Sequence, residues 1–405
     1  MFRRQMLQAT GVALAGVAVP AEAADPGVPP WMTRQGSPVS DVPYGTPSPF
    51  EASVVRRLRD KPVFPTAASA QAPLQDLDGI ITPNGLHYIR SHAGSPAIDP
   101  DRHRLLVHGL VDRPLSFAME DLVRFPSVSR LLFLECSGNT PLYKDSGVKP
   151  DWTVQDTHGL LSCAEWTGVR LSDVLAEAGV KPAARWMLAE GADAAAMTRS
   201  IPIAKAMDDA ILAYAQNGER LRPEQGYPLR LLLPGYEGNT NVKWLRRLKL
   251  GDQPFETREE TSKYTDLLAD GSAWQFNFVM EVKSVITRPS PGHQLKQTGF
   301  HEVSGLAWSG RGRVARVEVS SDAGETWQDA ALQEPVLPIC LTRFRAPWTW
   351  TGGTAALLSR ATDETGAVQP TRAALVAERG VNFFYHYNAI QAWQVGSDGT
   401  LRLAL

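Results

Sequence analysis

Residues 131–140 read LLFLECSGNT, and the rest of the chain is organised around this stretch. The apolar run predicts a short buried strand, and the SGN that follows predicts a polar turn. Cys136 lies where the strand ends. A thiolate in that position suits a nucleophile or a ligand for a soft metal, whereas a structural cysteine is simply a small buried side chain.

On either side of this stretch, short strands and helices follow one another without a regular pattern. Strands are predicted at 104–111, 211–215 and 229–233, with an Asn-Gly hairpin turn at 217–218. Helices are predicted from an N-cap at Ser172 to a stop at Gly179, and from Ser200 through Ala206. This mixture indicates an α+β fold rather than a doubly wound parallel sheet.

The sequence pattern changes from about residue 279 onward. Residues 313–320 (RVARVEVS) alternate with a period of two, and residues 355–362 predict another strand with a DETG turn at 363–366. Short strands with regularly spaced turns predict an all-β immunoglobulin-like sandwich.

The N-terminus resembles an export signal. Arg3 and Arg4 precede an apolar run from about residue 9 to residue 19, and an AEA cleavage motif follows at 21–23. The run is too short to cross a bilayer. A general secretory signal or a soluble helix is possible, but the adjacent arginines favour the twin-arginine route. We therefore expect a periplasmic protein that is exported already folded.

Four segments are expected along the chain. Residues 25–78 are rich in Pro, Ser and Ala, which predicts an extended arm. The segments are a signal peptide at 1–24, the arm at 25–78, an α+β catalytic domain at 79–265 and the sandwich at 266–405.

The composition excludes several classes of protein. The chain has 405 residues, of which 43% are hydrophobic and 21% charged, and its formal net charge is −2, so nucleic acid is not the expected partner. No later stretch predicts a membrane span. The 3 cysteines do not form a disulfide scaffold. Cys163 and Cys340 fall in different predicted domains and are not expected to pair.

The residues near Cys136 leave its chemistry open. None of the 8 histidines forms a recognisable hydrolase signature with this cysteine, and no Cys/His pair has the spacing of a zinc site. The chain has no Cys-x-x-Cys-His motif, so no covalently attached c-type haem is expected.

Five segments, in one order, resemble motifs of the sulfite oxidase family. The resemblance covers about residues 75–405. The segments are residues 81–92 (ITPNGLHYIRSH), 134–139 (LECSGN), 165–171 (EWTGVRL), 226–235 (GYPLRLLLPG) and 241–245 (NVKWL). The sandwich is similar to the dimerisation domain of that family.

This resemblance implies a sulfite-oxidase-like molybdopterin domain with a molybdenum–molybdopterin cofactor. Cys136 would supply the protein thiolate to molybdenum. His92, Arg230 and Lys243 would hold the pterin and its phosphate, with Arg246 as a weaker candidate. Guanidinium and ammonium groups are the donors that such an anionic cofactor needs. Each of these residues has a structural alternative. Arg230 would be a charge at a sheet edge, Lys243 and Arg246 would belong to a solvated basic face, and His92 would be a core or loop histidine.

The resemblance also suggests residues that face the substrate. Arg90 matches the family's active-site arginine, which steers an oxyanion. Tyr264 lies near the position of its active-site tyrosine, although a packing role fits equally well. Arg345 is a weaker candidate for a second contact with an anion.

The chain departs from the sulfite oxidases after Cys136. Those enzymes continue with Gly-Asn-Arg-Arg, whereas this chain reads Gly-Asn-Thr-Pro up to Pro141. Residues 143–152 replace an expected loop, and Asp156 lies near the place of an expected tryptophan. The pattern is most similar to the sulfane dehydrogenase branch of the family, which oxidises sulfur held as a persulfide on a carrier-protein cysteine.

That branch implies partners as well as a substrate. Electrons would leave to a cytochrome c subunit, in a heterotetramer built on a homodimer of the C-terminal domain. Three rivals remain: a periplasmic sulfite dehydrogenase acting on free sulfite, a reductase of the methionine-sulfoxide type, and a non-catalytic immunoglobulin-like binding protein whose cysteine is structural.

Overall fold

The computed structural model describes residues 44–58, 67–140 and 148–404, together with positions 29, 32, 33, 35 and 38. The expected signal peptide, much of the expected arm and residues 141–147 of the loop after Cys136 lie outside this part of the chain. Residues 54–405 form one compact unit, which contains all of the predicted site residues.

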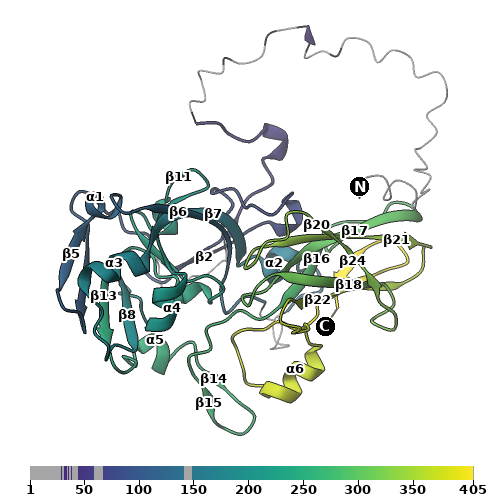
Figure 1. Cartoon of the computed structure of the whole chain (residues 1–405). Coiled ribbons are helices and arrows are strands. Elements are labelled where there is room, and N and C mark those ends of the chain that lie inside the picture. Colours follow the sequence, from purple (N-terminus) through teal and green to yellow (C-terminus); the bar gives the residue numbers. More distant parts are fainter. Residues whose placement is uncertain are drawn as a thin grey trace, which may run out of the picture. The chain divides into compact units, whose positions relative to one another are not determined.

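The first region of this unit is built on three sheets (Figure 1). One has the order β1 (Arg57–Leu58), β2 (Ala68–Gln71), β3 (Ile89–Ser91). A second has the order β11 (Glu219–Arg220), β10 (Ile211–Gln216), β7 (Leu161–Arg170), β6 (Ser127–Glu135), with β12 (Arg230–Leu232) also paired to β10. The third has the order β5 (Leu115–Ala118), β4 (Arg104–Gly109), β13 (Leu245–Gly251), β8 (Trp186–Gly191), β9 (Thr198–Pro202).

Short helices cover these sheets and connect them. They are α1 (Met119–Leu122), α2 (Val154–His158), α3 (Leu171–Ala178), α4 (Ile203–Asp208) and α5 (Arg258–Thr261), with 3₁₀ turns η4 (Leu74–Asp76), η5 (Pro223–Gln225) and η6 (Gly238–Thr240). A small hairpin of β14 (Asp266–Leu267) and β15 (Ala273–Trp274) follows. The predicted α+β character of this region is confirmed.

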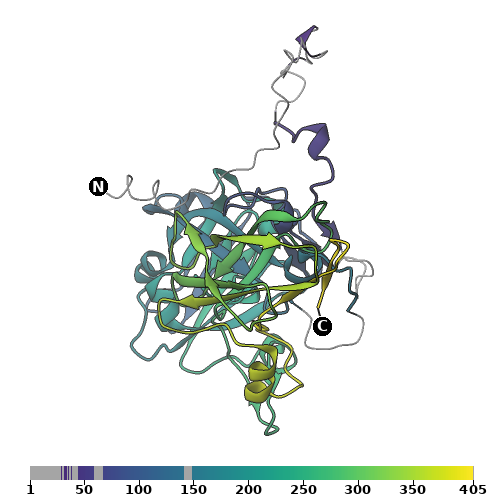
Figure 2. The ribbon, with the colours of Figure 1, turned by 90° about the vertical axis from the view of Figure 1, so that its right-hand side faces the viewer.

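The second region is a β-sandwich, which faces the viewer in Figure 2. One sheet has the order β16 (Lys283–Arg288), β17 (Gly299–Trp308), β21 (Thr342–Trp350), β20 (Ala331–Gln333). The other has the order β19 (Gln328–Asp329), β18 (Val314–Ser320), β22 (Ala355–Asp363), β23 (Ala392–Val395), β24 (Leu401–Leu403). The helix α6 (Arg372–Arg379) lies between β22 and β23 in the chain. The predicted β-rich C-terminal domain is confirmed.

One hydrophobic core runs through both regions. It includes Phe133 and Trp166 from the first region and Val285, Trp308 and Trp393 from the second. The backbone N–H of Phe133 donates to Ile339 O across the junction (3.2 Å). The two regions therefore share buried apolar surface, and this burial stabilises them together.

The cysteines outside the turn lie in this shared core. The sulfur atoms of Cys163 and Cys340 are 3.4 Å apart, although both thiols are free. Both side chains are buried. The two residues do not form a disulfide, as expected, but the junction of the two predicted domains brings their side chains into contact, which the sequence did not indicate.

Two helix starts differ from the sequence predictions. Arg170, not Ser172, is the N-cap of α3, because β7 continues directly into this helix; Gly179 ends it as predicted, with φ 72°. The segment at Ser200 is the end of β9, which pairs with β8, and α4 begins only at Ile203.

The end of the expected arm is part of the fold. Ala70, Ala72 and Leu74, in and beside β2 and η4, are fully buried. In the described part of the chain, no helix combines the length and the apolar character that crossing a bilayer requires.

Candidate active site

A cavity opens in the first region beside the end of β6. The space between its lining atoms, together with the open solvent at its mouth, amounts to about 660 Å³. Residues that are far apart in sequence line it, drawn from the segments 87–92, 134–136, 193–197, 225–244 and Tyr264. Its concave lining, which combines apolar and polar side chains, is typical of a site for a cofactor or a small substrate.

Cys136 enters this cavity from a tightly held turn. Its backbone N–H donates to Leu160 O (3.0 Å), and Asn139 N–H closes the turn on Cys136 O (2.9 Å). The buried Asn139 amide also donates to His158 O (3.0 Å) and accepts from Leu160 N–H (3.1 Å). The strand β6 and this turn therefore fix the place of the thiol.

The surroundings of Cys136 set the charge of its sulfur. Burial raises the pKa of the Cys136 thiol, while the Gly138 N–H and the positive charge of Arg90 oppose that rise. A buried thiolate requires a nearby positive charge, which a metal ion supplies effectively.

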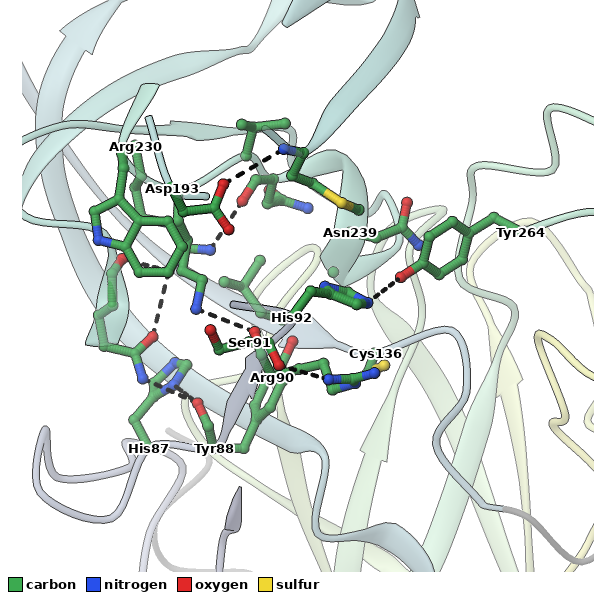
Figure 3. Close-up of a pocket in the computed structure, with 18 residues that line it drawn as sticks. His87, Tyr88, Arg90, Ser91, His92, Cys136, Asp193, Arg230, Asn239 and Tyr264 are labelled. Atoms are coloured by element: carbon green, nitrogen blue, oxygen red, sulfur yellow. Dashed lines mark hydrogen bonds between the residues drawn. The ribbon is translucent and has the colours of Figure 1, made fainter. Parts of the chain in front are cut away.

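Arg90, His92 and Tyr264 lie on the same side of the cavity as Cys136 in Figure 3. The Tyr264 hydroxyl contacts His92 Nε2 at 3.4 Å. Burial, followed by the charges of Arg90 and Lys243, lowers the pKa of His92 to about 4. Burial and the charge at Cys136 raise the pKa of Tyr264. At neutral pH, His92 is thus uncharged and Tyr264 keeps its proton.

Arg230 and Lys243 supply positive charge to the other side of the cavity. The Arg230 guanidinium lies 4.9 Å from the Trp166 ring and donates to the neutral oxygens Gln225 O (3.0 Å) and Asn241 O (3.2 Å). Lys243 Nζ donates to the carbonyl oxygens of Arg90 (3.1 Å) and Glu224 (2.9 Å). Neither cation forms an ion pair with a carboxylate among the described residues.

These two cations are unfavourably placed in the absence of an anion. Burial lowers the pKa of Arg230 to about 10, and burial together with the charge of Arg230 lowers the pKa of Lys243 to about 7. In the described part of the chain, Arg230 Nε and His87 Nε2 are buried without a hydrogen-bond partner. Such a site is complementary to a ligand that carries phosphate.

A glycine allows the cations to approach each other. Gly226 has φ 108°, and a Cβ atom there would lie 3.1 Å from the Cβ atoms of both Arg230 and Lys243. Any side chain at this position would be strained and would crowd both cations.

The donor set fits a metal that brings other ligands with it. Among the described residues, no group of three or more His, Cys, Asp or Glu side chains could hold a metal ion. Cys136 would therefore be a single protein ligand, and a pterin dithiolene held by the cations would supply further sulfur ligands.

The structure describes all eight predicted site residues, and six of them line this cavity: Arg90, His92, Cys136, Arg230, Lys243 and Tyr264. Arg246 points instead to Glu190, with its Nε 2.6 Å from Oε1. Arg345 lies on β21, where it contacts Glu302 and Gln333. The structure does not place these two arginines in the site, because each already has a carboxylate partner elsewhere.

Asp156, noted in place of a tryptophan, has a structural role here. It is the third residue of α2 and accepts hydrogen bonds from the backbone and hydroxyl of Thr153, both at 2.9 Å. It also pairs with Arg57 at 2.6 Å. Asp156 therefore caps a helix and anchors the segment that contains β1.

Sequence reasoning missed a buried polar cluster behind Tyr264. The Arg199 guanidinium pairs with Glu237 (3.1 Å) and Glu260 (3.5 Å) and lies 5.1 Å from the Tyr264 ring. It also donates to Asn239, which lines the cavity. No local motif marks Arg199, since its partners come from distant parts of the chain.

Comparisons with known proteins agree with this geometry. Residues 92–259 match the family model described as "Oxidoreductase molybdopterin binding domain", and residues 275–392 match "Mo-co oxidoreductase dimerisation domain". The crystal structure of the sulfane dehydrogenase SoxCD from Paracoccus pantotrophus is similar, with a TM-score of 0.90 and 46% sequence identity, covering 94% of this chain and 97% of that chain.

Curated relatives include enzymes with two different substrates. The mitochondrial sulfite oxidase of Rattus norvegicus is 35% identical over 67% of this chain and 52% of its own length. The nitrate reductase [NAD(P)H] of Hordeum vulgare is 35% identical over 70% of this chain and 35% of its own length. The matches therefore span about half of these relatives or less.

Proposed function

The chain belongs to the sulfite oxidase family of molybdopterin-dependent oxidoreductases, and we propose that it oxidises sulfane sulfur held on a cysteine of a carrier protein. Family membership makes it an enzyme with a molybdenum–molybdopterin cofactor, so the non-catalytic binding protein considered above is not supported. The substrate, the partners and the roles of individual residues belong to the proposal.

The position after Asn139 carries the substrate proposal. Where the sulfite oxidases read arginine, this chain has Thr140, which is buried, with its hydroxyl held by Lys283 in the core. Among the described residues that line the cavity, Arg90 and Arg230 are the arginines, and Arg90 is the one on the same side as Cys136 (Figure 3). A small free dianion is bound best by several such groups, whereas a sulfur tethered to a carrier needs less charge. The similarity to a sulfane dehydrogenase supports the same choice.

Each cavity residue has a role in this proposal. When bound, the molybdenum cofactor supplies two-electron oxygen-atom exchange with sulfur. Cys136 would ligate the metal, and His92, Arg230 and Lys243 would hold the pterin and its phosphate. Arg90 would attract the anionic sulfur terminus, and Tyr264, which keeps its proton, would donate a hydrogen bond to it.

The partners and the location follow the same proposal. We place the enzyme in the periplasm after twin-arginine export, as a homodimer through the sandwich, within a heterotetramer that includes a cytochrome c subunit. The match to a family dimerisation domain supports the dimer. The cytochrome would accept electrons one at a time, since this chain has no motif for attaching haem.

The test compares two sulfur substrates with the purified holoenzyme and uses cytochrome c as the electron acceptor. We expect turnover with a persulfide on a carrier protein and little with free sulfite. Elemental analysis in parallel should find molybdenum. Full activity on free sulfite and none on the carrier would favour the alternative, a periplasmic sulfite dehydrogenase. Activity only with a sulfoxide and an electron donor would favour the reductase.

A further inference from the structure

A second buried charged cluster lies on the other side of Cys136, at the junction with the sandwich. Lys283 is the first residue of β16 and Trp308 the last residue of β17, and the two are direct partners in the sheet register. Side chains of such partners lie side by side on one face of a sheet. Both point to Glu135, the last residue of β6, and all three side chains are at most 2% exposed.

The contacts in this cluster involve both ends of the cysteine turn. Lys283 Nζ donates to Glu135 Oε1 (2.9 Å), directly before Cys136, and to Thr140 Oγ1 (2.7 Å), at the end of the turn. Trp308 Nε1 donates to the other carboxylate oxygen, Glu135 Oε2 (2.7 Å). A single ammonium group of the second region thus binds the residues on both sides of the turn.

The backbone of the turn requires such support. Thr140 has φ 65°, in the left-handed region, which is unfavourable for a β-branched residue. Its side chain is buried, and its hydroxyl accepts the hydrogen bond from Lys283. A strained residue persists only where its surroundings hold it, and here a residue of the sandwich does so.

A buried ion pair contributes little to the net free energy of folding. Removing both charges from water costs about as much as their attraction returns, so such pairs are better explained by the geometry that they impose. Without the ammonium, the Glu135 carboxylate would be an uncompensated negative charge one residue from Cys136.

We propose that Lys283, together with Trp308, is a positioning residue of the second region that holds the turn of residues 136–140 in the shape needed for metal ligation by Cys136. The inference rests on the proposed role of Cys136 as the molybdenum ligand. It adds that the sandwich, beyond its part in dimerisation, is a structural component of the active site.

The test uses the metal-free, full-length protein and the reaction of Cys136 with iodoacetamide, followed by peptide mass spectrometry. Lys283→Met should raise the alkylation rate of Cys136 about tenfold, because the turn would open more often. Thr140→Val, which removes only one hydrogen bond, should raise it less. Cys163 and Cys340 are buried and serve as internal references.

Arg343→Met is the matched control. Arg343 is another buried cation of the sandwich that binds the first region, through Gly79 O and Leu77 O (both 3.0 Å), and it does not touch the turn. This variant should leave the Cys136 rate unchanged. Equal rates in wild type and Lys283→Met, or an equal rise in the Arg343→Met control, would overturn the proposal.

A double variant separates positioning from charge balance. Glu135→Gln combined with Lys283→Met removes both charges of the ion pair and also the hydrogen bond from Lys283 to Thr140. A rate that stays raised supports positioning, and a return to the wild-type rate overturns it. If Lys283→Met does not fold, Thr140→Val and Trp308→Phe give the same comparison. None of these measurements uses a sulfur substrate. Their outcome is therefore independent of whether the enzyme oxidises sulfane sulfur.

Discussion

Cys136 lies between two groups of cations that differ in how their charges are balanced. On the cavity side, Arg230 and Lys243 bind only neutral oxygens within the described structure. On the core side, Lys283 pairs with Glu135 at 2.9 Å. Arg230 and Lys283 are buried and Lys243 is partly buried. Only the second group has its positive charge balanced by a carboxylate within the described structure.

This difference distinguishes a ligand site from a structural one. Burial lowers the pKa of Lys243 to about 7, so the folded protein favours loss of its charge until an anion is bound. Charges left unbalanced at a cavity therefore mark the position of an anionic ligand, whereas balanced ones hold the fold together.

The largest expected effect is that of Cys136→Ser, which removes the atom between the two groups. Turnover should fall by about 10³-fold or more, equivalent to about 4 kcal/mol, because serine is a poor ligand for a soft metal. Turnover and molybdenum content per chain are the measurements. Unchanged values of both would mean that Cys136 is not the metal ligand.

Lys283→Met tests the balanced group through stability. It should lower the free energy of unfolding by about 3–5 kcal/mol, because Glu135 would remain buried without its partner. Urea denaturation of the metal-free protein measures this change. A loss no greater than that of an exposed ion pair would show that the two groups do not differ in the way described.

Lys243→Met tests the unbalanced group, Arg230 and Lys243. Its expected effect on the stability of the metal-free protein is opposite to that of Lys283→Met. Cofactor retention should weaken by roughly 10-fold to 100-fold, because one charged hydrogen bond to phosphate is lost. The metal-free protein should instead become slightly more stable, since a partly buried cation without a carboxylate partner is removed. Molybdopterin content and thermal unfolding give the two readouts, and a destabilised metal-free protein would contradict the expectation.

The same lysine predicts a pH dependence of the metal-free protein. Because the pKa of Lys243 is about 7 when folded and 10.5 ordinarily, the unfolded chain binds more protons between these values. Stability should therefore rise with pH across this window. The difference in unfolding free energy between about pH 7 and about pH 10 should shrink in Lys243→Met. An identical pH dependence in the two proteins would argue against a perturbed lysine.

The smallest effect is expected for Arg345→Met. Arg345 and its partner Glu302 are both nearly half exposed, so the pair should contribute about 0–1 kcal/mol. Turnover of the isolated enzyme and its thermal midpoint should stay close to wild type. A large loss of turnover would instead support the predicted contact between Arg345 and the substrate.

The sequence predicted the features that depend on neighbouring residues. The strand before Cys136 and the hairpin at Asn217 follow from short local patterns, and β6 and β10 confirm them. The six site residues found at the cavity lie in segments with local motifs, apart from the loosely matched Tyr264. Arg345 was assigned from a weaker pattern, and its cross-strand carboxylate was not visible in the sequence.

Contacts between distant residues could not be predicted. Lys283 is 148 residues from Glu135, and Cys163 is 177 residues from Cys340, yet each pair meets at the junction of the two regions. Periodicity predicts which face of a strand is buried, not which strand packs against it. The predicted boundary between the domains concealed these contacts, because it falls between the partners.

The grip of Lys283 on Glu135 and Thr140 limits how this protein can be recombined. A chimera that joined this N-terminal half to a sandwich without lysine at position 283 would carry a buried carboxylate without its cation, directly before Cys136. Grafts between relatives would have to exchange positions 135, 140, 283 and 308 as a set. The two halves are thus coupled through these four positions, even though each has the outline of a separate module.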